Sequence, residues 1–251
     1  MGLSLRQLGA HGPVYGPAGV GNGLPAVVIL HGAEGPMAGW SHRFAAIMAG
    51  HGMLALPVAF GDGDFWAAGA IREVDLTAVV AAGRALAAHP QAGRVGLLGW
   101  SKGGEAALLV AVLTGAGGPF TAVAAHAAPD RVLAAFDPQA MRAGRPFLDT
   151  AADAPRAWVW PGADLAPGTP IAVETAAMPL FLSAGTEDPI WDAAGMARAM
   201  AARCAAAGRP VDLMIAEGQG HGFDFDTEPQ LWARLVAFFG RHLSGGPGDG
   251  V

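Results

Sequence analysis

The 251-residue sequence contains one cysteine and lacks an apolar run long enough to cross a membrane. Cys204 therefore cannot form an internal disulfide, and its alanine-rich, helical surroundings indicate a packing residue. Without a continuous stretch of about 18 apolar residues, a membrane-spanning helix is excluded. The N-terminus shows neither the charged start nor the apolar block of a secretory signal peptide. We therefore expect a cytoplasmic protein without a membrane partner.

Charged residues are also scarce. They make up 14% of the chain, the formal net charge is −6, and Lys102 is the only lysine. Because no run of lysine and arginine is present, the composition argues against binding to nucleic acid or to an anionic membrane surface. The sequence has no cluster of cysteine and histidine and no His-Glu-x-x-His spacing, so we expect neither a metal ion nor another cofactor.

Strand-like and helix-like apolar patterns instead alternate along the chain, of which 52% is hydrophobic. At this length, the alternation predicts one α/β domain over residues 1–243, with a doubly wound, mostly parallel sheet and helices on both faces. The glycine-rich residues 244–251 are predicted to form a flexible tail. Strands are predicted at residues 26–30, 53–60, 94–98, 120–125, 178–183 and 211–216, and helices at residues 41–49, 70–89, 105–113, 192–207 and 228–243.

Residues 127–177 interrupt this alternation. The segment contains many prolines and shows no long periodic pattern of apolar residues. A span of this length without regular structure is uncommon inside a compact domain and usually has a function. We therefore predict an insertion that lines or covers the active site.

A Gly-x-Ser-x-Gly sequence, from Gly99 to Gly103, joins the predicted strand at residues 94–98 to the predicted helix at residues 105–113. On a strand-to-helix turn this tight, the hydroxyl of Ser101 stands at the top of the sheet, where it can act as a nucleophile. The turn needs small residues on both sides of the serine, and the two glycines meet this need. The alternative is that Ser101 only caps the helix.

A serine hydroxyl is a weak nucleophile, so it needs a base and a carboxylate that orients the base. In proteins with this elbow, the acid and then the histidine follow the serine along the chain. Asp188 comes shortly after one predicted strand, and His221 lies in a glycine-rich loop after the next. We predict that Ser101 is the nucleophile, Asp188 the acid and His221 the base. The alternatives are Glu187 as the acid, Asp188 as a helix cap, and His221 as an exposed loop residue.

The oxyanion hole of such a site uses two backbone N–H groups, one after the nucleophile and one in a loop after an earlier strand. We predict that Lys102 and Ala33 supply these groups. Two of the histidines that precede the acid, His31 and His126, follow predicted strands, but neither has the chain position expected of the base. His31 is predicted to support the oxyanion loop, and His126 to line the pocket.

Aromatic residues near these motifs are candidates for a substrate pocket, because apolar acyl groups bind against aromatic side chains. Ordinary packing is the alternative for each of them. Three arginines of the insertion, Arg142, Arg145 and Arg156, are candidates for binding the phosphates of coenzyme A, or else belong to a solvated face. The predicted substrate-binding residues are Trp66, Trp100, Trp158, Trp160 and Trp191.

These motifs resemble two groups of α/β-hydrolases. Over about residues 26–242, the chain is similar to the catalytic domain shared by acyl-CoA thioester hydrolases and bile-acid-CoA:amino-acid N-acyltransferases. The Ser-Lys-Gly-Gly-Glu start of the elbow helix and Trp191 carry this resemblance. The elbow and the Gly-His-Gly-Phe loop also resemble dienelactone hydrolases and their carboxylesterase relatives. The dienelactone enzymes have a cysteine at the position of Ser101, so the second resemblance implies a serine esterase.

We predict a serine hydrolase that cleaves carboxylic esters or thioesters through an acyl-enzyme on Ser101. Its partner is a small-molecule acyl substrate, and a carboxylesterase for small to medium acyl groups is the leading hypothesis. An acyl-CoA thioesterase or an N-acyltransferase is the first alternative, and a non-catalytic binding protein with the same fold is the second. Acyl length, leaving group and oligomeric state are not predicted, and a homodimer is left open.

Overall fold

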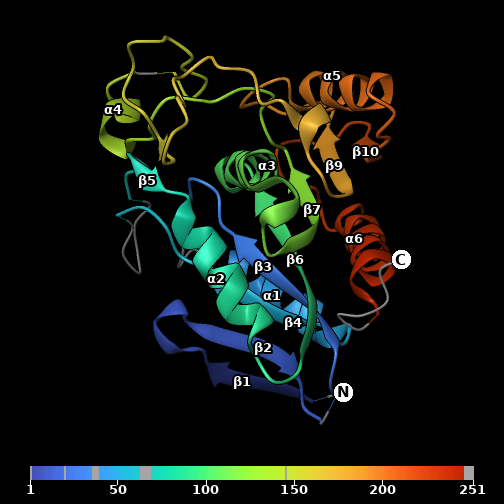
Figure 1. Cartoon of the computed structure of the whole chain (residues 1–251). Coiled ribbons are helices and arrows are strands. Elements are labelled where there is room, and N and C mark those ends of the chain that lie inside the picture. Colours follow the sequence, from blue (N-terminus) through green and yellow to red (C-terminus); the bar gives the residue numbers. More distant parts are fainter. Residues whose placement is uncertain (1, 20, 36–39, 63–68, 145, 246–251) are drawn as a thin grey trace.

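The computed structural model describes residues 2–19, 21–35, 40–62, 69–144 and 146–245 (Figure 1). Within this part of the chain, eight strands form one sheet in the order β1-β2-β4-β3-β6-β7-β9-β10. β1 and β2 form an antiparallel hairpin, β2 also pairs antiparallel with β4, and the other neighbours are parallel. These strands are Leu3–Gln7 (β1), Pro13–Pro17 (β2), Leu24–Leu30 (β3), Leu54–Val58 (β4), Ala92–Trp100 (β6), Phe120–His126 (β7), Leu180–Gly185 (β9) and Asp212–Ala216 (β10).

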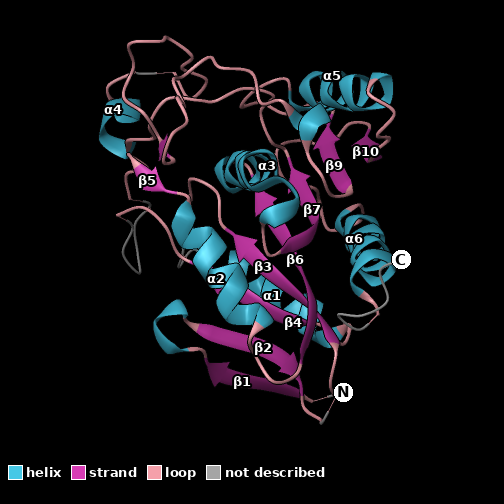
Figure 2. Ribbon diagram, in the orientation of Figure 1, coloured by secondary structure: helices cyan, strands magenta, loops and turns pink. Residues whose placement is uncertain are grey.

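Helices cover both faces of the sheet, which is why its central strands are apolar throughout. Alternate side chains of β3 enter two separate cores, with Val27 and Ile29 in one and Val28 and Leu30 in the other. All four side chains are fully buried. This doubly wound arrangement confirms the predicted fold class (Figure 2). The first core is completed by α1 (Trp40–Gly50) and α6 (Glu228–Leu243), and the second by α2 (Thr77–Ala87), α3 (Lys102–Thr114) and α5 (Ala193–Ala206).

Each predicted strand and helix overlaps an observed element, but the helix predicted at residues 70–89 was wrong in its first turns. There, Val74–Asp75 forms the short strand β5, which pairs in parallel with β8 (Trp158–Val159) from the insertion. Helix α2 then starts at Thr77, whose N–H and hydroxyl donate to Asp75 Oδ1 over 2.9 and 2.7 Å. Pairing with a distant segment therefore overrides the local helical spacing.

The insertion at residues 127–177 forms most of the loops at the top of Figure 1, next to α3. Besides β8, it contains the short helix α4 (Pro138–Arg142) and a 3-10 turn (Val173–Thr175). Most of the predicted tail, residues 246–251, lies outside the described residues. In the part that is described, no helix is both long enough and apolar enough to span a membrane.

Candidate active site

Ser101 stands on a sharp turn between β6 and α3. Its backbone has φ 55° and ψ −119°, a conformation that costs a non-glycine residue about 1–3 kcal/mol and is typical of a nucleophile elbow. Its N–H donates to the carbonyl oxygen of His126 over 2.9 Å, and its carbonyl accepts from the N–H of Glu105 over 3.0 Å. The hydroxyl makes no capping hydrogen bond to α3. The alternative that Ser101 serves only as a helix cap is therefore wrong.

Both glycines of the elbow are required by close contacts of the backbone. A Cβ atom on Gly99 would overlap the carbonyl oxygen of Gly103, and one on Gly103 would overlap the carbonyl oxygen of His31. The elbow thus packs directly against the end of β3. This contact brings the loop after β3 next to Ser101.

His221 connects Ser101 to Asp188 by two hydrogen bonds. Its Nε2 lies 2.9 Å from Ser101 Oγ, and its Nδ1 lies 2.6 Å from Asp188 Oδ2. Because a carboxylate only accepts, Nδ1 carries the hydrogen and Nε2 is left to accept the serine proton. The arrangement can therefore deprotonate Ser101 during attack on an acyl carbon.

The Asp188 carboxylate is fixed from its other side. Its side chain is 1% exposed, and Oδ1 accepts the N–H groups of Ile190 over 2.8 Å and Trp191 over 3.4 Å. Helix α5 is capped by Asp192 instead, which excludes a capping role for Asp188 there. The carboxylate that meets His221 is that of Asp188 and not that of the rival Glu187.

The loop after β3 is supported by His31, as its chain position predicted. The ring stacks on Phe60 at 3.8 Å, its Nδ1 lies 2.7 Å from the carbonyl oxygen of Gly32, and its Nε2 accepts the Phe60 N–H over 3.0 Å. Burial lowers the pKa of His31 to about 4, so the ring is neutral near pH 7. A Cβ atom on Gly32 would lie 3.1 Å from Ser101 Cβ, which places Ala33 beside the elbow. The oxyanion roles of Ala33 and Lys102 stay predictions.

Glu34 adds a second carboxyl group to the site. Its Oε1 accepts the N–H of Gly32 over 2.8 Å. Burial raises its pKa, and its hydrogen bonds with the backbone of Gly32 and Glu34 act in the opposite direction. One glutamate in a loop forms no sequence pattern, so the sequence could not assign a role to this side chain.

The five predicted substrate-binding tryptophans have different environments. Trp191 meets the His221 ring edge to face at 4.9 Å, and Trp100 lies within 3.5 Å of a Cβ atom built on Gly222. Trp158 is a correction, because it is fully buried and its indole N–H donates to Glu105 over 2.8 Å. Trp66 lies outside the described residues.

Trp160 is a second correction. It lines a cavity of about 320 Å³ together with Thr77 and Thr114. Thr114 is the last residue of α3, and a helix of that length separates its two ends by about 20 Å. Trp160 therefore lies away from Ser101.

A buried ion pair that the sequence did not predict anchors the insertion to the elbow helix. Lys102 Nζ lies 2.7 Å from Glu105 Oε2, and the two side chains are 1% and 0% exposed. Glu105 Oε1 accepts from the Leu133 N–H and from the Trp158 indole, each over 2.8 Å. Lys102 Nζ also donates to the carbonyl oxygen of Ala134 over 3.3 Å. These contacts hold two segments of the insertion against the first turn of α3.

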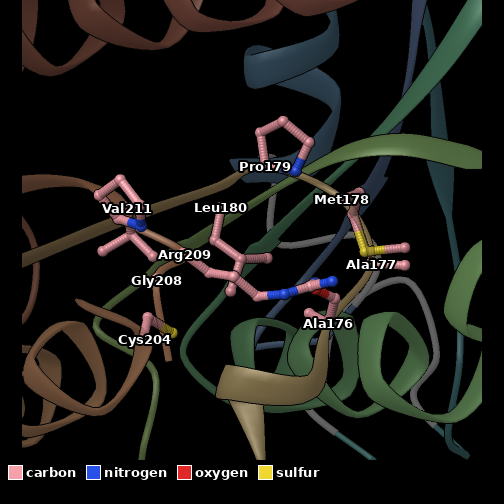
Figure 3. A pocket seen from close by; sticks show the side chains of 10 residues that line it. Ala176, Ala177, Met178, Pro179, Leu180, Cys204, Gly208, Arg209 and Val211 are labelled. Atoms are coloured by element: carbon pink, nitrogen blue, oxygen red, sulfur yellow. The ribbon is translucent and has the colours of Figure 1, made fainter. Parts of the chain in front are cut away.

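A separate cavity of about 420 Å³ lies at the amino ends of β9 and β10, whereas the triad lies at the carboxyl ends of the strands (Figure 3). Its lining includes Leu180, the first residue of β9, and Val211, which precedes β10. Asp188 and His221 follow the other ends of these strands, about 17 Å away. Cys204 also lines this cavity, so its buried thiol is remote from the triad.

Comparison with known proteins agrees with this fold. A family model described as the prolyl oligopeptidase family matches residues 63–246, whereas no curated protein matches the chain. A dienelactone hydrolase from Klebsiella pneumoniae subsp. pneumoniae is 17% identical with a TM-score of 0.66, over 95% of this chain and 98% of that chain. A puromycin-hydrolyzing peptidase from Mycobacterium tuberculosis is 20% identical with a TM-score of 0.69, over 99% of this chain and 40% of that chain. A lipase in its open form is 18% identical with a TM-score of 0.65, over 96% of this chain and 100% of that chain.

Proposed function

We propose that this chain, which belongs to the prolyl oligopeptidase family and is a serine hydrolase of the α/β-hydrolase type, is a carboxylesterase for small to medium acyl groups. The observation that carries the acyl-enzyme chemistry of this proposal is the continuous hydrogen-bonded path from Ser101 through His221 to Asp188, with contacts of 2.9 and 2.6 Å. Each of these residues has its own role in the reaction.

In the first half of the reaction, Ser101 Oγ attacks the acyl carbon while His221 Nε2 takes the hydroxyl proton. His221 then gives this proton to the leaving alcohol, and the acyl group stays on Ser101 as an ester. Asp188 keeps the Nδ1–H tautomer and stabilises the imidazolium formed in between. In the second half, water attacks the acyl-enzyme by the same steps, which releases the acid and restores Ser101.

The negative charge on the acyl oxygen needs donors that are in place before the reaction. We assign this role to the backbone N–H groups of Ala33 and Lys102, and one such donor typically accounts for about 10²–10³-fold in turnover. The support for rigid donors is structural, since His31 holds the loop of Ala33 and the Glu105 carboxylate holds the Lys102 side chain.

An uncharged, apolar acyl ester fits the surroundings better than a coenzyme A thioester. Trp191 provides an apolar wall beside His221, which suits an uncharged acyl group. Among the arginines suggested for coenzyme A, Arg156 is paired with Asp164 at 2.6 Å. Arg145 lies outside the described residues.

Hydrolysis of peptide or aminoacyl amides is the second candidate function. The prolyl oligopeptidase family match favours it, and one structural neighbour is a puromycin-hydrolyzing peptidase. The triad geometry serves both reactions, because ester and amide hydrolysis share the tetrahedral intermediate. An amide leaving group depends more strongly on protonation by His221 than a phenolate does.

Three substrate series decide among these functions. We would compare p-nitrophenyl esters of increasing acyl length, acyl-CoA thioesters, and aminoacyl and dipeptidyl p-nitroanilides, with Ser101→Ala as the blank. Highest kcat/KM for short or medium esters, lost in Ser101→Ala, is the expected result. A higher kcat/KM for the anilides would instead establish a peptidase, and a preference for acyl-CoA would establish a thioesterase.

A further inference from the structure

His126 contacts the segments that carry Ser101, Asp188 and His221. It is the last residue of β7 and is 1% exposed. Strand β7 lies between β6, which leads to Ser101, and β9, which leads to Asp188. Its carbonyl oxygen accepts the Ser101 N–H over 2.9 Å. Its ring Nδ1 lies 2.9 Å from the hydroxyl of Ser183 in β9, and its Nε2 lies 3.0 Å from the carbonyl oxygen of His221. One buried side chain thus ties the loop of the base to the sheet.

These partners determine which ring nitrogen carries the hydrogen. A carbonyl oxygen only accepts, so Nε2–H donates to His221, and Nδ1 accepts from the Ser183 hydroxyl. Burial lowers the pKa of His126 to about 3, which keeps the ring neutral and this tautomer intact at working pH. The sequence placed His126 in the pocket lining, whereas the structure buries it beneath the His221 loop.

Packing restricts the His126 ring on two sides. Trp100 stacks on it with ring centroids 4.0 Å apart and planes at 28°, and Phe223 meets it edge to face at 4.8 Å. The following residue, Ala127, is buried and has φ 48°, a conformation that non-glycine residues adopt only when the surrounding structure imposes it. The ring therefore has little freedom to move away from His221.

We propose that His126 is a positioning residue that holds the His221 loop in the position at which His221 Nε2 forms its hydrogen bond with Ser101 Oγ. The inference rests on the proposed function, because it requires Ser101 and His221 to be the reacting pair. His126 acts through the main chain of His221 and does not itself meet the acyl group. A displacement of the base by about 1 Å can lower the rate about 100-fold.

Two amide substitutions separate this role from simple packing. Glutamine places an N–H group near the position of His126 Nε2 and keeps the donor to His221. Asparagine places its amide near the position of Nδ1, so it keeps an acceptor for Ser183 but does not reach His221. We expect His126→Asn to lower kcat for a p-nitrophenyl ester about 100-fold with little change in KM, and His126→Gln to stay within about 10-fold of the wild type.

The rate at which a fluorophosphonate modifies Ser101 should follow the same order, because this step needs His221 but no acyl pocket. Urea unfolding of both variants provides the stability control. Equal kcat values for His126→Gln and His126→Asn, or values that follow unfolding stability, would overturn the proposal. Hydrolysis that survives in Ser101→Ala would overturn the proposed function and this inference together, which distinguishes the two failures.

A measurement on the wild-type protein keeps the inference testable if neither variant folds. The ¹⁵N chemical shifts of the His126 ring report which nitrogen is protonated. We expect the Nε2–H tautomer from neutral pH down to about pH 4, since burial holds the pKa of this ring at about 3. An Nδ1–H tautomer would remove the donor to His221 and contradict the proposal.

Discussion

Replacing Lys102 with methionine should destabilise the fold more than most single substitutions. The change removes the cation that faces Glu105 and leaves a fully buried carboxylate with the Leu133 N–H and the Trp158 indole as its remaining partners. Breaking a buried ion pair from one side costs about 3–5 kcal/mol. A typical domain has a free energy of unfolding of about 5–15 kcal/mol, so this loss is a large fraction of the total.

The double variant Lys102→Met/Glu105→Gln should recover most of this loss. It removes both charges, and the amide that replaces the carboxylate keeps an oxygen acceptor for Leu133 and Trp158. Replacing both partners of a buried pair by neutral groups is often close to neutral in stability. Urea unfolding of the wild type, both single variants and the double variant gives the coupling energy directly.

The pH dependence of Lys102→Met provides a second readout. Burial raises the pKa of Glu105 in the folded protein above its value in the unfolded chain. The folded state therefore binds this proton more tightly, and stability falls as pH rises through the folded pKa. The deficit of Lys102→Met should be smaller at about pH 5 than at about pH 8. Single-variant losses that simply add in the double variant would refute a coupled ion pair.

Three further predictions concern the triad, the elbow and acid stability. Asp188→Asn should lower kcat about 10⁴-fold with little effect on urea unfolding, because it favours the wrong tautomer of His221, and unchanged steady-state kinetics would contradict this role. Gly103→Ala should prevent the close contact of the elbow with His31, so we expect a lower melting temperature and loss of fluorophosphonate labelling at Ser101. A fully active Gly103→Ala variant would contradict this contact. Stability should fall as pH drops from about 6.5 to 5, because burial lowers the pKa of five histidines, so that the unfolded chain takes up protons first. The raised pKa values of Glu34 and Glu105 act in the opposite direction, but these are two carboxyl groups against five imidazoles. A flat stability profile in urea unfolding would contradict this prediction.

The sequence predicted the central sheet and the triad positions for the same reason. Strands buried on both faces leave short continuous apolar runs that end at turn residues, such as residues 26–30, which are followed directly by His31 and Gly32. Residues just after such runs lie at the carboxyl edge of a parallel sheet, so Ser101, Asp188 and His221 could be placed together from their chain positions. The structure brings these three side chains into hydrogen-bond contact.

The features that the sequence missed depend on partners that are distant along the chain. Strand β5 exists because it pairs with β8, more than eighty residues later. Trp158 is an aromatic residue of the kind that lines acyl pockets, yet it lies in the core, where its indole N–H donates to Glu105. Strand β1 exists because it pairs with β2; its Leu3 and Leu5 are exposed, so its short apolar alternation does not mark a buried face. His126 likewise gains its role only from the fold, which places it beneath the loop of His221.

Covalent modification by a fluorophosphonate tests the central claim that Ser101 is an activated nucleophile. Intact-mass spectrometry of the treated protein, followed by peptide mapping, would locate the adduct, with Ser101→Ala and His221→Ala as matched controls. We expect one adduct on Ser101 in the wild type, none in Ser101→Ala, and strongly slowed modification in His221→Ala. An unmodified wild type, or an adduct that persists in Ser101→Ala, would contradict the claim.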